Sequence, residues 1–377
     1  MGEFEIVPLK NQDVNIWEEF LRKTANNSFF ATYDYISSFG NESFFLIKRN
    51  KAEIVSALPF VIQRLVPVVG KFMEICRVET EVLILNTYST EESLNIKTEM
   101  FQKLIDYLKT RFVATLYITT KIRSNDAEIY QALGFETNKC GTYLINLEND
   151  IDSIYRNFSK GHKSAVQKAI KCGVDVSVYK NEQAKDHIFE FLETQKKLYE
   201  RRQKTLSVLY LKSEGFINTI LSSKYHDVYV TIASYNNQTA ATAIFVSYND
   251  TIYYYAGNSN YELVRESQAA NYLQFEMIKF AQSAGYKYYD FGGAEIDPEP
   301  ENELYGVTLF KKNFGGYLET YDCGKLIINQ RINNIVKIIS KLQNNRFVGL
   351  VYKLKKIDMK NILVIAPHPD DEVLGCG

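Results

Sequence analysis

The sequence predicts a mixed α/β fold in which two copies of one module follow each other. A chain of 377 residues is longer than a single hydrophobic core normally supports, so at least two domains are expected. Segments with helical and strand periodicity alternate along the chain. The segments YQALGFETNKCGTYLINL (130–147) and LFKKNFGGYLETYDCGKLII (309–328) both place a helix before a corner of Gly and Phe and a Tyr-containing strand. This internal repeat predicts a duplicated module with mixed, largely antiparallel sheets flanked by helices.

The composition indicates a globular protein without a strong overall charge. Hydrophobic residues make up 46% and charged residues 24% of the chain, and the net charge is -1. Such a balance provides no global field that would attract DNA or an anionic membrane. The N-terminus lacks a basic region followed by an apolar core, and no apolar run reaches about 18 residues, so we expect no signal peptide and no membrane span. The five cysteines are scattered, which favours reduced thiols and a cytoplasmic location.

The first module is expected to cover residues 1–150. Apolar residues recur at helical spacing in three segments and at strand spacing in four others. The predicted helices are 12–24, 91–110 and 127–133, and the predicted strands are 44–48, 54–62, 116–120 and 142–147.

The second module is expected to cover residues 151–328. Asn-Asn and Asn-Asp pairs at 236–237 and 249–250 predict tight turns between the strands of an antiparallel meander. The predicted helices are 154–172, 186–203, 212–222 and 267–284, and the predicted strands are 174–179, 227–234, 239–248, 251–256 and 286–291. A helical connector should follow at 329–360, and a new strand begins the last segment, 361–377.

Four segments of the second module carry a resemblance to a known group of proteins. FSKGHKSAVQKAIKCGVDV (158–176), YYYAGNS (253–259), NYLQFEMIKFAQSAGYKYYDFGGA (271–294) and LYGVTLFKKNFGG (304–316) resemble the FemAB/FemX group. That group carries two modules of the Gcn5-related N-acetyltransferase (GNAT) fold, and YQALGFET (130–137) resembles the closing signature of that fold. The resemblance implies transfer of an acyl or aminoacyl group to a free amine of a cell-envelope or glycan precursor.

The resemblance and the side-chain chemistry together nominate Lys311 and Asp290, within 286–322, and Tyr255 as catalytic residues. Lys311 precedes Phe-Gly-Gly and is expected to stabilise the oxyanion that forms when an amine attacks a carbonyl. Asp290, in YYDFGG, is a candidate base for the amine proton, although capping the turn of Gly292 and Gly293 is as plausible for it. Successive strand residues face opposite sides, so only one of Tyr254 and Tyr255 can line the cleft. The resemblance favours Tyr255.

Further residues are expected to bind substrate. Arg202 has the planar fork that clamps a phosphate or carboxylate. His162 and Lys163 lie where the resemblance implies basic residues, and Gly292 and Gly293 permit close approach of a ligand or positive φ. The basic helix that contains His162 is interpreted as a solvated face, with a phosphate-binding edge as the alternative.

The acyl donor stays open between acyl-CoA and aminoacyl-tRNA. A glycine-rich loop that would cradle a CoA pyrophosphate is missing before the helices that begin near 91 and 267. Use of tRNA is therefore possible, and the acceptor is expected to be an amino-sugar or peptidoglycan precursor. The alternatives are an aminoacyl-tRNA-dependent transferase of the peptidoglycan-bridge type and a non-catalytic glycan-binding module.

A second resemblance lies in the last segment. Ala366–Glu372, APHPDDE after the apolar run NILVIA, resembles the opening motif of the PIG-L/LmbE zinc deacetylases. The resemblance implies that His368 and Asp371 are zinc ligands and that Asp370 is a general base. Two ligands are fewer than the three protein ligands that a catalytic zinc site needs. Zinc is thus expected only where the deacetylase domain is complete.

Overall fold

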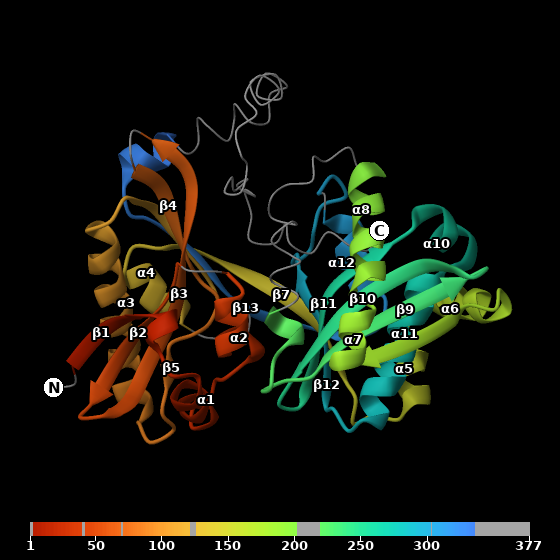
Figure 1. The fold of residues 1–377 in the computed structure, drawn as a ribbon, viewed down its shortest axis with the longest axis horizontal. Coiled ribbons are helices and arrows are strands. Elements are labelled where there is room, and N and C mark those ends of the chain that lie inside the picture. The colour runs from red at the N-terminus through yellow and green to blue at the C-terminus, as the bar shows by residue number, and fades with distance from the viewer. Residues whose placement is uncertain are drawn as a thin grey trace. The chain divides into compact units, whose positions relative to one another are not determined.

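A computed structural model describes residues 3–39, 42–68, 71–120, 126–201, 219–302 and 304–335. Within them the chain forms two compact units (Figure 1). Unit 1 contains the residues up to Lys139 and those from Tyr321 onward, and unit 2 contains Cys140 to Thr320. In the described part of the chain, no helix is both long and apolar enough to cross a bilayer.

Unit 1 is a mixed sheet with helices packed against it. Its strand order is β1-β2-β3-β4-β6-β13, and only the β4/β6 pair is parallel. The strands are β1 (Glu3–Pro8), β2 (Ser43–Asn50), β3 (Glu53–Val68), β4 (Lys71–Val78), β5 (Leu83–Ile84), which pairs β3, β6 (Val113–Thr119) and β13 (Tyr317–Ile327). The helices are η1 (Leu9–Asn11), α1 (Val14–Arg22), η2 (Phe29–Ala31), α2 (Tyr33–Ser37), α3 (Thr90–Lys109) and α4 (Ala127–Ala132).

Helix α3 shows how the sequence determines an element of unit 1. Ser89 and Glu92 form a capping box that satisfies free N–H groups at the first turn. Met100, Leu104 and Leu108 recur every four residues and are fully buried against the sheet. The helix therefore begins and packs as its sequence predicts.

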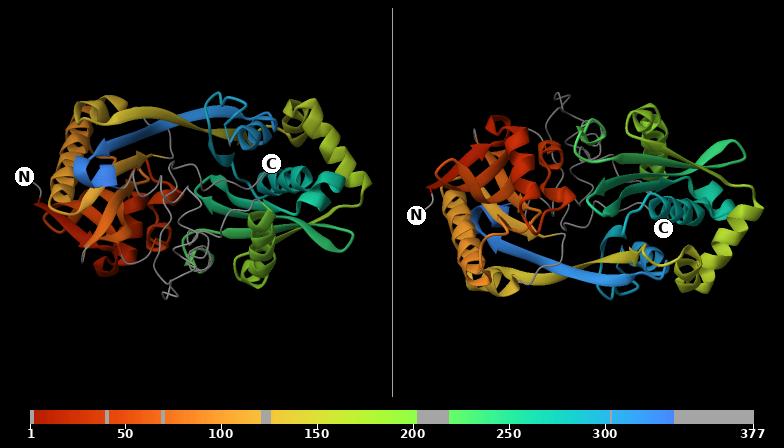
Figure 2. Two further views of the ribbon diagram at one scale, coloured as in Figure 1. Left: turned by 90° about the horizontal axis from the view of Figure 1, so that it is seen from above. Right: turned by 90° about the horizontal axis from the view of Figure 1, so that it is seen from below.

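Unit 2 has the same kind of sheet, in the order β8-β9-β10-β11-β12-β7, with β11/β12 as its parallel pair. The strands are β7 (Glu136–Asn146), β8 (Asp175–Lys180), β9 (Val228–Tyr235), β10 (Gln238–Tyr248), β11 (Thr251–Ser259) and β12 (Tyr288–Ala294). The helices are α5 (Ile151–Asn157), α6 (Lys160–Lys171), α7 (Glu182–Asp186), α8 (Ile188–Arg201), α10 (Tyr261–Ser267), α11 (Ala269–Ser283) and α12 (Tyr305–Lys312). Figure 2 shows α11 and α8 on opposite faces of this sheet.

The two units are copies of one topology in which the last strand is exchanged. Strand β7 follows α4 of the first half of the chain but pairs with β12 in unit 2, and β13 follows α12 but pairs with β6 in unit 1. The mixed α/β fold with largely antiparallel sheets is confirmed, and the repeat of 130–147 in 309–328 corresponds to α4–β7 and α12–β13. The boundaries between the compact units consequently lie at Lys139/Cys140 and Thr320/Tyr321. The module bounds expected from the sequence were 150 and 328.

The cysteines differ from the expectation of reduced thiols. Cys140 and Cys323 are disulfide-bonded, whereas Cys76 and Cys172 are free. This state could not be predicted from the sequence, because spacing along the chain reports only on local cysteine pairs.

Candidate active site

The parallel strands of unit 2 separate part-way along their length. β11 and β12 pair only from Thr251/Tyr288 to Tyr253/Asp290, although β11 continues to Ser259 and β12 to Ala294. The corresponding pair in unit 1, β4/β6, has an irregularity between Glu74 and Ile75 but stays paired up to Val78/Ile118, at the last residue of β4. Beyond Asp290 the facing edges of β11 and β12 are therefore not paired with each other, and separated strand edges are places where proteins take up extended ligands.

Both separating strands carry a β-bulge at this point. In β11, Ile244 pairs with Ala256 and Phe245 with Tyr254, so Tyr255 is the inserted residue. In β12, Asp290 pairs with Leu144 and Gly293 with Thr142, which leaves two residues of β12 opposite one residue of β7. Bulges bend a strand and redirect its side chains, and they are over-represented beside active sites.

Asp290 lies buried where the strands part. Its Oδ1 accepts a hydrogen bond from the Thr142 hydroxyl and another, 2.7 Å long, from the Gly292 N–H. Burial raises the pKa of the carboxyl, and the two hydrogen bonds and the nearby charge of Lys311 act in the opposite direction. Gly292 has a φ of +71°, and a Cβ there would lie 3.2 Å from the Tyr254 carbonyl oxygen, so glycine permits this bulge.

Lys311 is fully buried at the end of α12, whereas its neighbour Lys312 is exposed. Its ammonium donates to the carbonyl oxygen of Gly292 at 3.3 Å and to that of Gly293. The cation therefore fixes the carbonyl groups of the bulged end of β12, close enough to Asp290 to affect its pKa.

The second Gly-Gly pair anchors α12. A Cβ on Gly315 would lie 2.2 Å from the Asn157 carbonyl oxygen, and one on Gly316 would lie 2.5 Å from that of Leu144. These glycines let the chain after α12 approach α5 and β7 closely, which sets the position of Lys311. Their role is backbone packing within unit 2.

The tyrosines of β11 divide between the two faces of the sheet. Tyr254 is buried in the core against Phe245, with ring centroids 5.4 Å apart, and Tyr255 is only partly buried. Tyr253 pairs with Asp290, whose charge adds to burial in raising the pKa of this tyrosine. Sequence reasoning missed Tyr253 and Thr142, because only strand pairing brings them beside Asp290.

His162 and Lys163 make contacts inside unit 2. The buried His162 ring donates from Nε2 to the Phe310 carbonyl oxygen at 3.0 Å and packs edge-on to Phe314, and burial lowers its pKa. Lys163 donates to the Arg156 carbonyl oxygen at 2.6 Å. Both residues thus join α6 to its neighbours α5 and α12, whereas Asp290, Thr142, Gly292, Gly293 and Lys311 form one cluster.

The remaining predicted site residues lie outside the described residues. They are Arg202, His368, Asp370 and Asp371. Among the residues that the structure does describe, no group of three or more His, Cys, Asp or Glu side chains is arranged to hold a metal ion.

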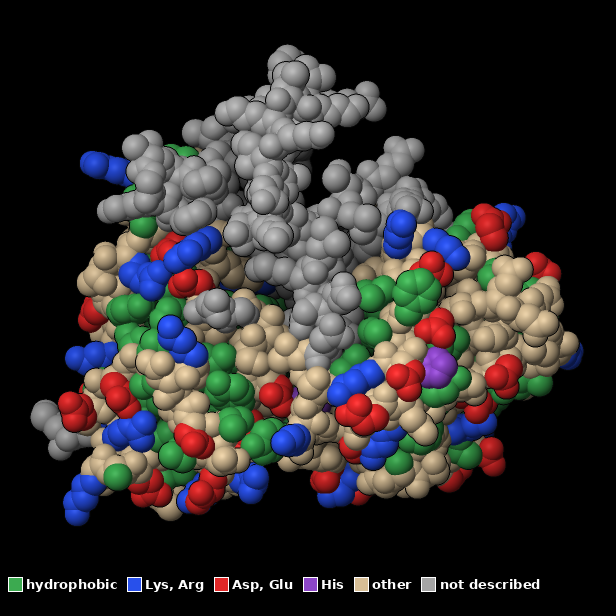
Figure 3. All heavy atoms as spheres, in the orientation of Figure 1, with side chains coloured by type: hydrophobic (Ala, Val, Ile, Leu, Met, Phe, Trp, Pro, Cys, Tyr) green, Lys and Arg blue, Asp and Glu red, His purple; other side chains and the backbone are tan. Residues whose placement is uncertain are grey.

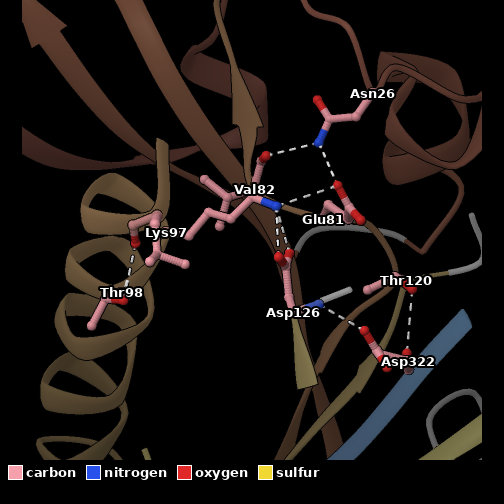
Figure 4. A network of polar contacts seen from close by, with 9 residues as sticks. Asn26, Glu81, Val82, Lys97, Thr98, Thr120, Asp126 and Asp322 are labelled. Atoms are coloured by element: carbon pink, nitrogen blue, oxygen red, sulfur yellow. Dashed lines mark hydrogen bonds and ion pairs between the residues drawn. The ribbon is translucent and has the colours of Figure 1, made fainter. Parts of the chain in front are cut away.

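Unit 1 has a different polar centre at the matching end of its sheet. Lys97 of α3 forms an ion pair with Asp126 at 2.6 Å and lies 3.7 Å from Glu81 (Figure 4). The Asp126 N–H donates to Asp322 at 2.9 Å. Gly134 and Gly315 both have positive φ and occupy equivalent places in the two repeats. Tyr130 precedes Gly134 by four residues, and Lys311 precedes Gly315 by four residues. The position of the buried lysine is therefore occupied by a buried tyrosine in unit 1.

Comparison with known proteins agrees with this fold. Residues 156–302 match the family model of the acetyltransferase (GNAT) domain. The solved structure of FemX superposes with a TM-score of 0.64 at 16% identity, covering 89% of this chain and 99% of FemX. A tandem GNAT protein from the clavulanic acid biosynthesis pathway gives 0.55 at 12% identity, covering 87% and 99%. The fold is a tandem GNAT fold of the FemX type.

Curated relatives match over a shorter stretch. The lipid II:glycine glycyltransferase of Staphylococcus epidermidis is 32% identical over 109 residues, which are 27% of this chain and 26% of that protein. The protein of the same description from Staphylococcus aureus is 32% identical over 105 residues, or 28% and 25%. The match thus spans about a quarter of the length of these relatives.

Proposed function

We propose that this protein is an acyl- or aminoacyltransferase that acts on a free amine of a cell-envelope precursor, with its active site where β11 and β12 part. The observation that carries the proposal is the asymmetry between the units. Unit 2 has the separated strands, the two bulges and the buried Asp290–Lys311 cluster, whereas β4 and β6 of unit 1 stay paired. The match of 156–302 to the acetyltransferase domain supports the same location.

In the proposed reaction the donor lies along the open edges of β11 and β12 with its carbonyl carbon near the bulges. The acceptor amine attacks this carbon, a C–N bond forms, and the C–S bond of a thioester or the C–O bond of an ester breaks. The amine proton passes to the Asp290 carboxylate, and the leaving thiolate or alkoxide takes up a proton. Burial supports the assignment of Asp290 as the base, because a raised pKa strengthens a carboxylate as a proton acceptor.

Lys311 has a positioning role in this proposal. Its ammonium holds the carbonyl groups of Gly292 and Gly293, and with them the backbone that surrounds Asp290. Its charge also favours the negative oxygen that develops during attack, as the sequence suggested.

The acceptor class rests on the relatives. The staphylococcal relatives are lipid II:glycine glycyltransferases, so a peptidoglycan or amino-sugar precursor is the acceptor proposed for this chain. Acyl-CoA and aminoacyl-tRNA both remain candidate donors. The deacetylase motif with His368, Asp370 and Asp371 stays a prediction, as does its zinc.

Product analysis tests the proposal. The full chain is incubated with acyl-CoA or aminoacyl-tRNA mixtures and amine acceptors, and products are detected by mass spectrometry. Lys311→Met should lower the transfer rate by about 100-fold or more, because removing one oriented polar group at a reacting centre has that effect. Lys312→Met, in the same helix but exposed, is the matched control and should transfer at the wild-type rate.

Two results would contradict the proposal. Equal rates for the Lys311 and Lys312 variants would remove Lys311 from the mechanism. Glycan binding without transfer from any donor would favour the non-catalytic binding module instead.

A further inference from the structure

Helix α6 presents a one-sided row of lysines to solvent. His162, Val166 and Ala169 are buried, so the opposite side of the helix is its outer face. At 3.6 residues per turn, Lys160, Lys168 and Lys171 fall within about 80° of one another on that outer face, over a length of about 16 Å. All three side chains are exposed. The three lysines therefore form a stripe, which we call the α6 face.

The segment of the chain that contains the α6 face carries charge of one sign. The residues from Ser153 to Val174 include five basic side chains and no acidic one. The nearest acidic residues in the chain are Asp152 before this segment and Asp175 after it. Within the part of the chain that the structure describes, Lys160, Lys168 and Lys171 form no ion pair.

Some exposed lysines elsewhere in the protein form ion pairs. Lys23 and Lys287 pair with Glu19 and Asp250 at 2.9 and 2.7 Å. The face drawn in Figure 3 likewise carries acidic and basic side chains in mixture. On α6, by contrast, three exposed lysines lie in one row on one face of a helix.

The side chains of the α6 face favour anionic phospholipids over RNA as its ligand. Its other exposed side chains are Ser164, Gln167 and, at the flank, Ile170, which is 48% exposed. Surfaces that bind RNA add aromatic rings or arginine forks on which bases stack, and the α6 face has neither. A straight row of lysines beside an exposed aliphatic side chain suits phospholipid headgroups above an acyl layer.

The α6 face also begins next to the proposed active site. The Ser159 N–H, which precedes α6, donates to the Asn313 carbonyl oxygen at 2.8 Å, immediately after α12. The exposed Lys312 lies at this junction and extends the positive surface toward the helix that carries Lys311.

We propose that the α6 face docks the protein on a bilayer that contains anionic phospholipids. Each lysine within reach of the headgroups contributes electrostatic attraction, and Ile170 contacts the boundary of the acyl layer. The docking is peripheral and salt-sensitive, and it does not depend on the transfer reaction.

Vesicle sedimentation of the full chain tests this docking. Wild type should bind vesicles of phosphatidylcholine mixed with phosphatidylglycerol, and should not bind phosphatidylcholine alone. The triple variant Lys160→Gln, Lys168→Gln, Lys171→Gln should lower the partition coefficient by about 100-fold, since each lysine near an anionic surface accounts for about fivefold. A matched triple, Lys10→Gln, Lys51→Gln and Lys103→Gln, removes three exposed lysines of unit 1 and should bind like wild type.

Other outcomes would overturn the docking. The docking is wrong if wild type does not bind the anionic vesicles. It is also wrong if the two triple variants lose vesicle binding to the same extent. A third result would also overturn the docking: wild type binds bulk tRNA but not vesicles, and the triple variant of the α6 face loses the tRNA binding. Should thermal unfolding show that the α6 triple is unstable, Lys168→Gln alone should still lower vesicle binding about fivefold.

Discussion

At the scale of single residues, the pKa of Asp290 depends on one hydroxyl group. The Thr142 side chain donates to its carboxylate and thereby lowers a pKa that burial has raised. Thr142→Val removes this donor, so the Asp290 pKa should rise further. A base acts in its deprotonated form, and the acid limb of the pH–rate profile should then move to higher pH.

Thr142→Ser keeps the hydroxyl and is the matched control. Its acid limb should stay at the wild-type pH, as measured by kcat/KM for transfer across the acidic range. An unchanged limb in Thr142→Val, with activity retained, would show that Asp290 does not titrate in the reaction.

The sequence predicted some of these residues and necessarily missed others. Lys311 and Asp290 were found because they stand in a motif with the glycines. Thr142 was not found, since it reaches Asp290 only through the pairing of β7 with β12, strands separated by more than a hundred residues. His162 was predicted to bind substrate because the resemblance implies basic residues there. In the structure the ring packs against Phe314, a contact that the sequence alone does not reveal.

At the scale of elements, the position of α12 depends on Gly315. Its φ of +75° disfavours a side chain, and a Cβ would also lie 2.2 Å from the Asn157 carbonyl oxygen. Gly315→Ala should therefore cost several kcal/mol of stability, about 3 or more, because backbone strain and a backbone clash add. The midpoint of denaturant unfolding measures the loss.

Gly285 offers a matched control for Gly315. Its φ is +85°, but a Cβ there would meet nothing within 4 Å. Gly285→Ala should cost only about 1 kcal/mol, from the positive φ alone. Equal losses in the two variants would mean that the contact with Asn157 does not constrain α12.

Elements with a strong local pattern were predicted best. Helix α3 and the meander β9–β11 follow from apolar spacing and from asparagines at 236, 237 and 249, all of which have positive φ. The separation of β11 from β12 and both bulges could not be predicted, because register is a property of paired strands rather than of one strand.

At the scale of the whole molecule, the exchange of last strands determines which fragments can fold. The repeat in the sequence suggested a second module at 151–328, but a fragment with these bounds lacks β7. Strand β12 would then lose its antiparallel partner from Gly141 to Asn146, and one of its edges would be exposed. The same fragment would retain β13, whose partner β6 belongs to the other unit.

A fragment of residues 136–320 keeps β7 and omits most of β13. It should therefore be soluble and show a cooperative thermal transition, whereas 151–328 should aggregate or unfold without cooperativity. Circular dichroism melts and size-exclusion chromatography of the two fragments measure the difference. Cooperative folding of 151–328 alone would contradict this prediction. Unit 2 would then fold without β7, so the strand that comes from the first half of the chain would be dispensable for its sheet.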